Sequence, residues 1–547
     1  MKIEDVLAEL HRADVRVSRR DLIRLAALGG AAAAGLGEAL GGAPAAEGAT
    51  GKRGGVWRMA IPGNPTAYPI TIPGKLVDIL VNKTIFSTLV RYQLVNGGIQ
   101  VVPDLAQSWT ANASLTEYTF KLRSGVKWHD GQPLTADDVK FTLDALLNPK
   151  VNAGLAGVVA AIKETQVVDP LTVRFVTQYP YASLPVMLGY NIAIVPKHLL
   201  QSQDLNQPVA FIQHPVGTGP FRFKSFTQDT AMEVEANPDY WDGAPMLDGI
   251  VFKVIPDGNA RLAQLKSGDI DFTVIDPPQL AALQGVSGIR VRRAPQVNYY
   301  FFAINHDLPK FADLRVRQAL TYAIDKQAIV KNILKGDGRP ATGPINPLLG
   351  AYYNPDVDTY PYNMDKAAGL LAEAGWKKGP DGILVNAQGQ KFTLSMNGPK
   401  GYPVMEQVLT YAQQQYKTLG FDATLEIVDW PVHLTTYVKR QYELLMEWWI
   451  TPPDPDEYDH YYSTSSDNYW GYKNTALDSL LIKARSEPDP QKRVALYRQI
   501  QDLIAKDIPL VYLYYPPELQ AMSTRTQGLP LIGYRDALTW TSRVWLS

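Results

Sequence analysis

The sequence predicts an α/β protein built from two large lobes. Its 547 residues exceed the roughly 250–300 residues at which a single hydrophobic core stops growing. Two nearly continuous apolar runs, residues 249–255 and 298–304, suit strands buried on both faces of a sheet. Segments with helical spacing occur between the strand-like segments, which is typical of sheets covered by helices. No repeat and no flexible linker divides the chain, so we expect strands that cross between the lobes.

A strand followed by a short helix is predicted in the first third of the chain. Residues 116–123 alternate polar and apolar side chains, the period of a half-buried strand. Thr135 and Asp138 have the spacing of a capping box, with Asp in place of the usual Glu, and such a box marks a helix start. The apolar residues at helical intervals after it are Val139, Leu143 and Leu146.

Two later helices are predicted to begin at capping aspartates. Asp313 precedes one run of apolar residues, and Asp489 precedes another. Pro490 follows the second aspartate directly, and proline is favoured at the first helical position. The apolar positions are Val316, Leu320, Ala323 and Ile324 in the first helix and Leu496, Ile500, Leu503 and Ile504 in the second.

Composition and charge exclude several classes of function. Apolar residues make up 46% of the chain and charged residues 20%, which is ordinary globular usage. The 29 tyrosines and 11 tryptophans suit either large cores or a stacked ligand. A net charge of −1 argues against binding nucleic acid or anionic lipid. The chain has no cysteine, which excludes disulfides, thiolate metal sites, cysteine nucleophiles and an N-terminal lipid anchor on cysteine.

The N-terminus resembles a twin-arginine export signal. Residues 18–24 read Ser-Arg-Arg-Asp-Leu-Ile-Arg, and Leu22 stands where such signals more often have Phe. An apolar stretch over residues 25–40 follows, too short and weakly hydrophobic for a stable membrane span. Residues 43–45, Ala-Pro-Ala, supply small residues for cleavage. We therefore expect residues 1–45 to be a signal peptide and the mature protein to be periplasmic and not lipid-anchored; the alternative is an amphipathic helix of the folded domain.

Recognisable catalytic and metal-binding motifs are missing from the sequence. The seven histidines are scattered without metal-ligand spacing. Neither a G-x-S-x-G nucleophile elbow nor a phosphate-binding P-loop occurs. We expect no cofactor, no metal and no enzymatic activity. A hydrolase with two distant carboxylates leaves no sequence signature, so that alternative stays open.

Several sequence blocks along the chain form an ordered series. The main block spans residues 103–146, from Pro-Asp-Leu-Ala-Gln-Ser-Trp through Val-Lys-Trp-His-Asp-Gly-Gln-Pro to Ala-Asp-Asp-Val. Further blocks follow in order at residues 215–220, 237–241, 265–271, 315–320 and 471–474. Together these blocks resemble the family 5 extracellular solute-binding proteins, a family that includes peptide-, nickel- and opine-binding proteins. The resemblance covers essentially the whole mature chain.

This resemblance implies a two-lobed periplasmic-binding-protein fold of type II, with an extra inserted subdomain. Lobe I would comprise residues 54–298 plus 516–547, with the subdomain at about 86–215. Lobe II would comprise residues 299–515. The hinge strands would cross near residues 298–305 and return near 514–522, and the ligand would be enclosed between the lobes.

The family pattern also implies candidate ligand-binding residues. In peptide-binding members, a Trp-containing segment of the second lobe supplies an aspartate for the peptide's amino terminus. Here residues 447–456 read Glu-Trp-Trp-Ile-Thr-Pro-Pro-Asp-Pro-Asp, and Thr451 falls where that aspartate would be. The candidates are Trp448, Trp449, Thr451 and Asp454 in this segment, and Asn64 and Tyr68 in the loop after the first strand. Core packing of the tryptophans, a solvated acidic loop and a surface turn are the alternative interpretations.

The function that these observations predict is capture of a small, peptide-like solute for an ABC importer. The expected partners are the ligand, the membrane permease and separate ATPase subunits, and the protein is expected to be a monomer. An oligosaccharide or opine receptor is the first alternative. A secreted hydrolase and a periplasmic chaperone or sensor partner are the others.

Overall fold

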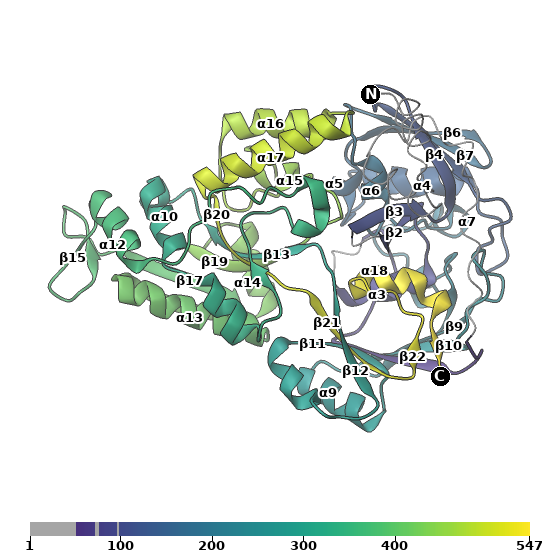
Figure 1. Ribbon diagram of the computed structural model, residues 1–547. Coiled ribbons are helices and arrows are strands. Elements are labelled where there is room, and N and C mark those ends of the chain that lie inside the picture. The colour runs from purple at the N-terminus through teal and green to yellow at the C-terminus, as the bar shows by residue number, and fades with distance from the viewer. Residues whose placement is uncertain (1–50, 72–75, 96–97) are drawn as a thin grey trace, which may run out of the picture. The chain divides into compact units, whose positions relative to one another are not determined.

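The computed structural model describes residues 51–71, 76–95 and 98–547 (Figure 1). The predicted signal peptide, residues 1–45, lies outside the described residues. Gly51–Ser547 is one compact unit, and the description below concerns that unit alone.

The first large sheet has seven strands in the order β12-β21-β11-β1-β10-β9-β8. The strands are β1 (Val56–Ile61), β8 (Phe221–Thr227), β9 (Ala231–Ala236), β10 (Gly249–Val254), β11 (Phe272–Ile275), β12 (Ile289–Ala294) and β21 (Glu518–Ser523). β1 pairs in parallel with β10 and β11. Trp57 and Met59 of β1 share a core with helix α3 (Leu76–Ile85), whereas Ala60 belongs to a separate cluster with helix α9 (Gly258–Ser267). Alternating side chains of one strand therefore bury both faces of this sheet.

An antiparallel four-stranded sheet packs into the first of these cores. It comprises β4 (Ala106–Ala111), β5 (Glu117–Leu122), β7 (Thr172–Thr177) and β6 (Ile162–Asp169). Strand β5 confirms the predicted strand, and helix α4 (Ala136–Leu147) confirms the predicted helix. The Thr135 N–H donates to Asp138 Oδ2 at 2.9 Å, as a capping box requires. The neighbouring elements are β2 (Val90–Val95), β3 (Gly98–Pro103), α5 (Ala156–Val159), α6 (Leu184–Gly189), α7 (Lys197–Leu200) and α8 (Val209–Gln213).

The second large sheet has six strands in the order β14-β20-β13-β19-β17-β18. They are β13 (Asn298–Ile304), β14 (Arg339–Pro340), β17 (Thr393–Pro399), β18 (Asp422–Val428), β19 (Leu444–Ile450) and β20 (Leu510–Tyr515). Phe302 and Ile304 of β13 pack on one face, and Tyr299, Phe301 and Ala303 pack on the other. The predicted strand buried on both faces is confirmed.

Helices cover both faces of the six-stranded sheet. Helices α10 (Leu314–Tyr322), α12 (Met364–Glu373) and α13 (Pro403–Leu419) pack on one face, and α16 (Thr475–Ser486) and α17 (Pro490–Asp507) pack on the other. Asp313 Oδ1 accepts the Arg315 N–H, and Asp489 Oδ1 accepts the Gln491 N–H, each at 2.9 Å. Both predicted capping aspartates are therefore confirmed. The remaining α-helices and strands are α11 (Lys326–Ala328), α14 (Trp430–Val438), α15 (Tyr458–Tyr461), α18 (Tyr534–Ala537), β15 (Lys377–Lys378), β16 (Leu384–Val385), β22 (Thr526–Gln527) and β23 (Trp545–Leu546).

The chain crosses between the two large sheets twice. It leaves the seven-stranded sheet at the end of β12 and enters the six-stranded sheet with β13. It returns from β20 to β21, and Figure 1 shows this second crossing in yellow. Only residues 295–297 and 516–517 separate the strands at these crossings. The full set of predicted domain limits stays a prediction.

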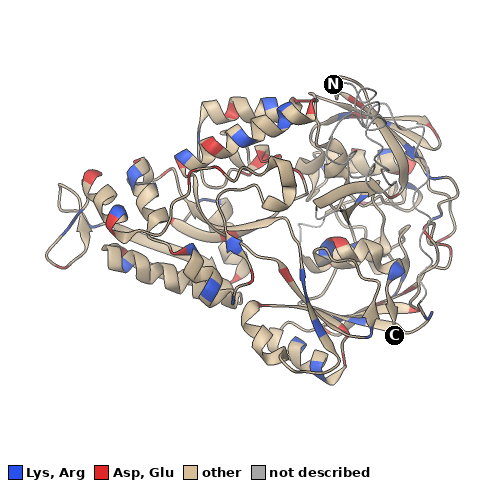
Figure 2. Cartoon of the chain, in the orientation of Figure 1, with Lys and Arg blue, Asp and Glu red and all other residues tan. Residues whose placement is uncertain are grey.

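Residues of both charge signs occur along α16 and α17, as the blue and red segments of these two helices show in Figure 2. None of the helices within residues 51–71, 76–95 and 98–547 combines the length and the apolar character needed to cross a membrane.

Candidate functional site

A cavity of about 240 Å³ is lined by residues from both halves of the fold. Trp449 comes from β19 of the six-stranded sheet, and the other lining residues come from α3 and the residues that flank it, from residues 155–193 and from the C-terminal tail. The lining residues are Pro69, Ile79, Asn82, Lys83, Phe86, Thr88, Leu155, Tyr190, Asn191, Ala193, Trp449 and Arg535. Ligand sites are frequent at such junctions between lobes, so this cavity, called the junction cavity below, is the candidate site.

Helix α3 positions two buried polar side chains at the junction cavity. Leu80, Val81 and Ile85 of this helix are fully buried in the first core. Asn82 and Lys83 are only 9% and 6% exposed. A lysine in the last helical turn is favourably placed relative to the helix dipole. The apolar face of α3 therefore anchors the helix, and its polar turn contributes to the cavity wall.

Lys83 is a buried cation with incomplete compensation. Its Nζ donates to the Gly189 carbonyl at 3.4 Å and lies 3.9 Å from Asp536 Oδ1. Burial lowers the pKa of Lys83 below its ordinary value of 10.5; Asp536 and Asp104 oppose that shift, and Arg535 adds to it. An ammonium group has three donors, and these two long contacts leave it poorly satisfied.

Tyr190 and Arg535 form another part of the cavity wall. The guanidinium of Arg535 lies over the Tyr190 ring, 5.4 Å from its centroid. The Tyr190 hydroxyl donates to the Ile450 carbonyl at 3.0 Å. Because Ile450 is the last residue of β19, this hydrogen bond joins the first core to the six-stranded sheet.

The adjacent tryptophans of β19 point to opposite faces of the sheet. Trp449 packs with the core under α16 and α17, and its ring centroid lies 4.3 Å from that of His460. Trp448 packs on the other face and is stacked on Tyr300 at 6.0 Å. Of the two predicted tryptophans, only Trp449 lines the junction cavity.

Trp448 belongs to an aromatic cluster with Tyr402 and Trp430. The ring of Trp448 lies 5.2 Å from that of Tyr402 and 5.5 Å from that of Trp430. Tyr402 and Trp430 are each 37% exposed. These rings offer a partly open flat surface on which a planar group can stack.

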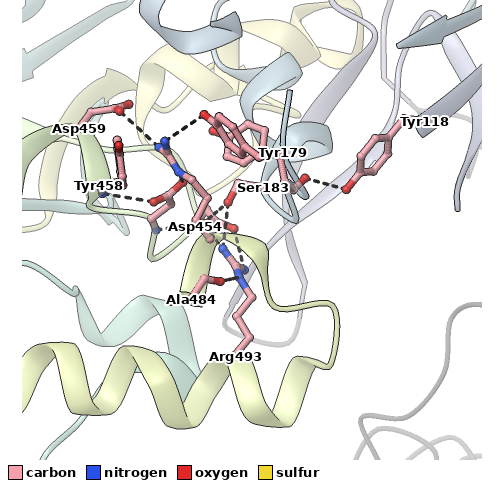
Figure 3. A network of polar contacts seen from close by, with 11 residues as sticks. Tyr118, Tyr179, Ser183, Asp454, Tyr458, Asp459, Ala484 and Arg493 are labelled. Atoms are coloured by element: carbon pink, nitrogen blue, oxygen red, sulfur yellow. Dashed lines mark hydrogen bonds and ion pairs between the residues drawn. The ribbon is translucent and has the colours of Figure 1, made fainter. Parts of the chain in front are cut away.

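Asp454 forms a buried ion pair with Arg493 (Figure 3). Its two carboxylate oxygens accept from Arg493 Nη2 at 2.7 Å and Nη1 at 3.1 Å. The Ser183 hydroxyl also donates to Asp454 Oδ1, at 2.9 Å. Asp454 is only 5% exposed, so this carboxylate is already satisfied by protein groups.

A second ion pair lies beside the first. Arg485 Nε donates to Asp456 Oδ2 at 2.8 Å, and its Nη1 donates to the Tyr179 hydroxyl at 3.3 Å. The Ala182 N–H donates to the Arg485 carbonyl at 3.1 Å. Burial raises the pKa of Asp456, and Arg485 opposes that shift. Residues 179–183 are thus tied to the second half of the fold. We call the contacts of Tyr179, Ala182 and Ser183 with Arg485, Arg493 and Asp454 the bridging network; Figure 3 labels Tyr179, Ser183, Asp454 and Arg493 of this network.

The other three predicted site residues contact protein groups. Asn64 Nδ2 donates to Asp229 Oδ1 at 2.6 Å. Tyr68 is fully buried in the first core, where its hydroxyl donates to the Leu205 carbonyl at 2.8 Å. The Thr451 N–H donates to the Val297 carbonyl at 3.0 Å. None of the three lines the junction cavity, and ligand contact by them stays a prediction.

Sequence reasoning missed Asn82, Lys83, Tyr190 and Arg535. One signal was present: the polar pair Asn82-Lys83 interrupts an otherwise mostly apolar helical run over residues 76–86. Tyr190 and Arg535 are far apart in sequence from this pair, and no local pattern marks either residue.

A second cavity, of about 320 Å³, lies within the second half of the fold. It is lined by residues of α10, α11 and α17 and by residues 358–362. Lys326 is one of its polar groups, and burial lowers the pKa of this lysine to about 8. None of the described residues that line this second cavity comes from the first half of the fold. Across the described part of the chain, no group of three His, Asp or Glu side chains is arranged to hold a metal ion.

Comparison with known proteins identifies the family. Residues 100–471 match the family described as "Bacterial extracellular solute-binding proteins, family 5 Middle". The chain is 34% identical to the oligopeptide-binding protein AppA of Bacillus subtilis over 429 residues, covering 77% of this chain and 79% of AppA. It is 28% identical to the dipeptide-binding protein of Escherichia coli over 474 residues, covering 81% and 86% of the two chains.

Solved structures agree with these sequence matches. AppA from Bacillus subtilis in complex with a nonapeptide superimposes with a TM-score of 0.81 at 31% identity, covering 91% of this chain and all of AppA. NikZ from Campylobacter jejuni in complex with Ni(L-His) gives a TM-score of 0.80 at 26% identity, covering 90% and 99%. The predicted two-lobed solute-binding fold is therefore confirmed. This chain belongs to the family 5 bacterial extracellular solute-binding proteins.

Proposed function

We propose that this protein is the substrate-binding component of an ABC importer. It captures a small, peptide-like solute between its two lobes and delivers it to the membrane permease, while separate subunits hydrolyse ATP. The observation that carries the proposal is the junction cavity, whose wall combines Trp449 of β19 with Lys83 of α3. A ligand in contact with both lobes favours the closed arrangement, which is the form that a transporter can recognise.

The peptide-like class is supported by the relatives and by the cavity wall. The two curated relatives described above are named as oligopeptide- and dipeptide-binding proteins. Apolar walls with a few polar groups are the usual composition of a small-molecule site. Ile79, Phe86 and Leu155 provide apolar walls here, and Asn82 and Lys83 provide polar ones.

A binding role without catalysis fits the chemistry of this cavity. No carboxylate and no histidine is found among the described residues that line it. General acid–base hydrolysis of peptides or glycosides uses such groups. We therefore favour a receptor over a secreted hydrolase. The proposal further includes that the protein acts as a monomer and without a cofactor.

An opine or oligosaccharide is the second candidate ligand. The aromatic cluster of Trp448, Tyr402 and Trp430 favours it, because partly exposed flat rings suit stacking against planar or sugar groups. A ligand of this class is expected to quench the fluorescence of Trp430, which is the more exposed tryptophan of the cluster, and Trp430→Ala is expected to abolish that quenching.

Export through the twin-arginine route is part of the proposal. Arg19 and Arg20 form the pair that such signals require. The double variant Arg19→Lys with Arg20→Lys is expected to leave the precursor in the cytoplasm, measured by fractionation and immunoblotting. Arg24→Lys is the matched control and is expected to be exported. Export of the double variant at the normal level would point to the general secretion route.

Native mass spectrometry tests the ligand class directly. The protein is purified from its own cell envelope without unfolding and is weighed before and after denaturation. A discrete added mass that matches a short peptide and is lost on denaturation supports the proposal. An added mass that fits an opine or an oligosaccharide, and no peptide, favours the second candidate.

A further inference from the structure

We infer that the junction cavity recognises a carboxylate of its ligand, with Lys83 as the binding cation and Arg535 beside it. The inference rests on the proposed function and names the ligand chemistry of the same site. It starts from the charge balance of the cavity wall. Lys83 and Arg535 both line the cavity, and no Asp or Glu does so within the described residues.

The first argument is the poor compensation of Lys83. A buried charge is costly unless it is paired and hydrogen-bonded. The nearest carboxylate oxygen, on Asp536, is 3.9 Å away, and the one hydrogen bond, to Gly189, is 3.4 Å long. An incoming carboxylate completes the hydrogen bonds of the ammonium group and stabilises its charged form.

The second argument is the buried amide of Asn82, one residue before Lys83. Its Oδ1 is buried and has no hydrogen-bond partner among the described residues. Buried polar atoms in folded proteins normally have a partner. The χ2 torsion of asparagine is broad, so a small rotation lets the amide accept from an N–H group of the ligand. A carboxylate next to an N–H is the arrangement at the C-terminal residue of a peptide.

The third argument is size. An apolar cavity of about 150 Å³ accommodates benzene, with its six carbon atoms. By the same proportion, 240 Å³ accommodates about ten non-hydrogen atoms. This is the size of a small dipeptide, and Trp449 provides a flat apolar wall for its side chains.

A matched pair of probes tests the inference: alanyl-alanine and its C-terminal amide. The two differ in charge at one end and are nearly equal in size. The purified protein is titrated with each by calorimetry. Charged hydrogen bonds contribute more than neutral ones, so the free acid is expected to bind at least about tenfold more tightly than the amide.

The variant Lys83→Met removes the ammonium and keeps the length of the side chain. It replaces a poorly compensated buried charge with an apolar group, and the carboxylate nearest to Lys83, that of Asp536, remains partly exposed to solvent at 31%. It is expected to lower the affinity for alanyl-alanine at least about tenfold and the affinity for the amide by a smaller factor, because the amide carbonyl makes only a neutral-acceptor hydrogen bond to the ammonium. Arg535→Gln is a second variant with a smaller expected loss in the same direction. Lys140→Gln, on the exposed surface of α4, is the control and keeps the wild-type preference.

The outcomes separate this inference from the proposed function. Equal binding of the acid and the amide by the wild-type protein overturns the carboxylate inference and leaves the peptide receptor standing. An undiminished preference in Lys83→Met also overturns it. If neither probe binds the wild-type protein and native mass spectrometry finds a non-peptide ligand, the peptide assignment fails and this inference fails with it.

Discussion

At the residue scale, the structure changes the interpretation of the acidic loop after β19. From sequence, Asp454 was a candidate for ligand contact beside Asp456 and Glu457. In the structure, Asp454 pairs with Arg493, Asp456 with Arg485, and Glu457 with His460. Each carboxylate has a buried cationic or imidazole partner, so the local excess of acidic residues in the sequence does not produce a free negative site.

Asp454→Asn is expected to lower stability rather than to weaken ligand contact directly. The substitution leaves the Arg493 guanidinium buried without its counter-charge, which costs about 3 kcal/mol of unfolding free energy. Urea denaturation of the variant and the wild type measures this loss. Asp144→Asn, which breaks an exposed pair with Lys140, is the control and should cost less than about 1 kcal/mol. Unchanged stability combined with lost ligand binding would instead make Asp454 a ligand-contacting residue.

His129 is expected to make the protein less stable as the pH falls from about 6.5 to about 4. The Gly217 N–H donates to His129 Nδ1 at 3.2 Å, and Nε2 contacts the Gly219 carbonyl at 3.0 Å. Burial lowers the pKa of His129 to about 4 from an ordinary value of 6.5. Between these two values the unfolded chain binds a proton that the folded protein does not, so stability falls with decreasing pH.

The measurement is the urea midpoint at several pH values for the wild type and His129→Gln. The variant should show a shallower decrease. His306, whose pKa burial also lowers to about 4, should account for part of the remaining slope. Replacing the exposed His214 by Gln serves as the control. An identical pH dependence in wild type and His129→Gln would contradict the assignment.

At the scale of elements, the segment over residues 215–220 packs closely against the C-terminal end of α3. A Cβ added at Gly217 would lie 1.9 Å from the Ile85 carbonyl oxygen, and one at Gly219 would lie 2.6 Å from backbone atoms of the same helix end. Glycine is therefore required at both positions by close approach of two backbones. This close packing is the physical reason for the two glycines in the family-like sequence block at residues 215–220.

Gly217→Ala is expected to destabilise the protein by about 3 kcal/mol, since backbone atoms of α3 must shift to admit the methyl group. Thermal unfolding measures the loss. Gly157→Ala is the control, because a Cβ at Gly157 meets nothing within 4 Å. Equal melting temperatures for Gly217→Ala and the wild type would show that α3 can move without cost.

At the scale of the whole molecule, two short crossings and the bridging network connect the two halves. The polypeptide backbone itself connects the halves, from β12 to β13 and from β20 to β21. The bridging network is not covalent, and it links residues 179–183 to Arg485 and Arg493. We expect this network to form as the lobes close, because lobe closure around a ligand brings such surfaces together.

Ser183→Ala is expected to weaken binding of alanyl-alanine about fivefold, the equivalent of about 1 kcal/mol. The Ser183 hydroxyl lies 2.9 Å from both Arg493 Nη2 and Asp454 Oδ1. The Asp454–Arg493 pair stays intact in the variant, so only the Ser183 link between the halves is removed and the contacts of Tyr179 and Ala182 with Arg485 remain. Calorimetry measures the change, and Ser225→Ala on the exposed part of β8 is the control. An unchanged affinity would show that the network does not contribute to closure.

The sequence by itself determined the mixed architecture, the family and most local elements. Alternation over residues 116–123 and the caps at Asp313 and Asp489 depend on neighbouring residues only, and each proved right. The ordered sequence blocks along the chain were sufficient to identify the family. The sequence also implied that Trp448 and Trp449 face opposite sides of the sheet, since adjacent residues of a strand do so. Only the tertiary structure shows which of the two sides faces the junction cavity.

Tertiary structure decided which polar groups are free and which meet at the site. Asp454 pairs with an arginine 39 residues away, and Lys83 shares a cavity wall with Trp449 and Arg535. Pairing and burial depend on contacts between residues distant in sequence, and no local period or spacing encodes them. For this reason the fold and the class of the protein could be predicted from the sequence, whereas the cavity and its buried cation could be identified only in the packed structure.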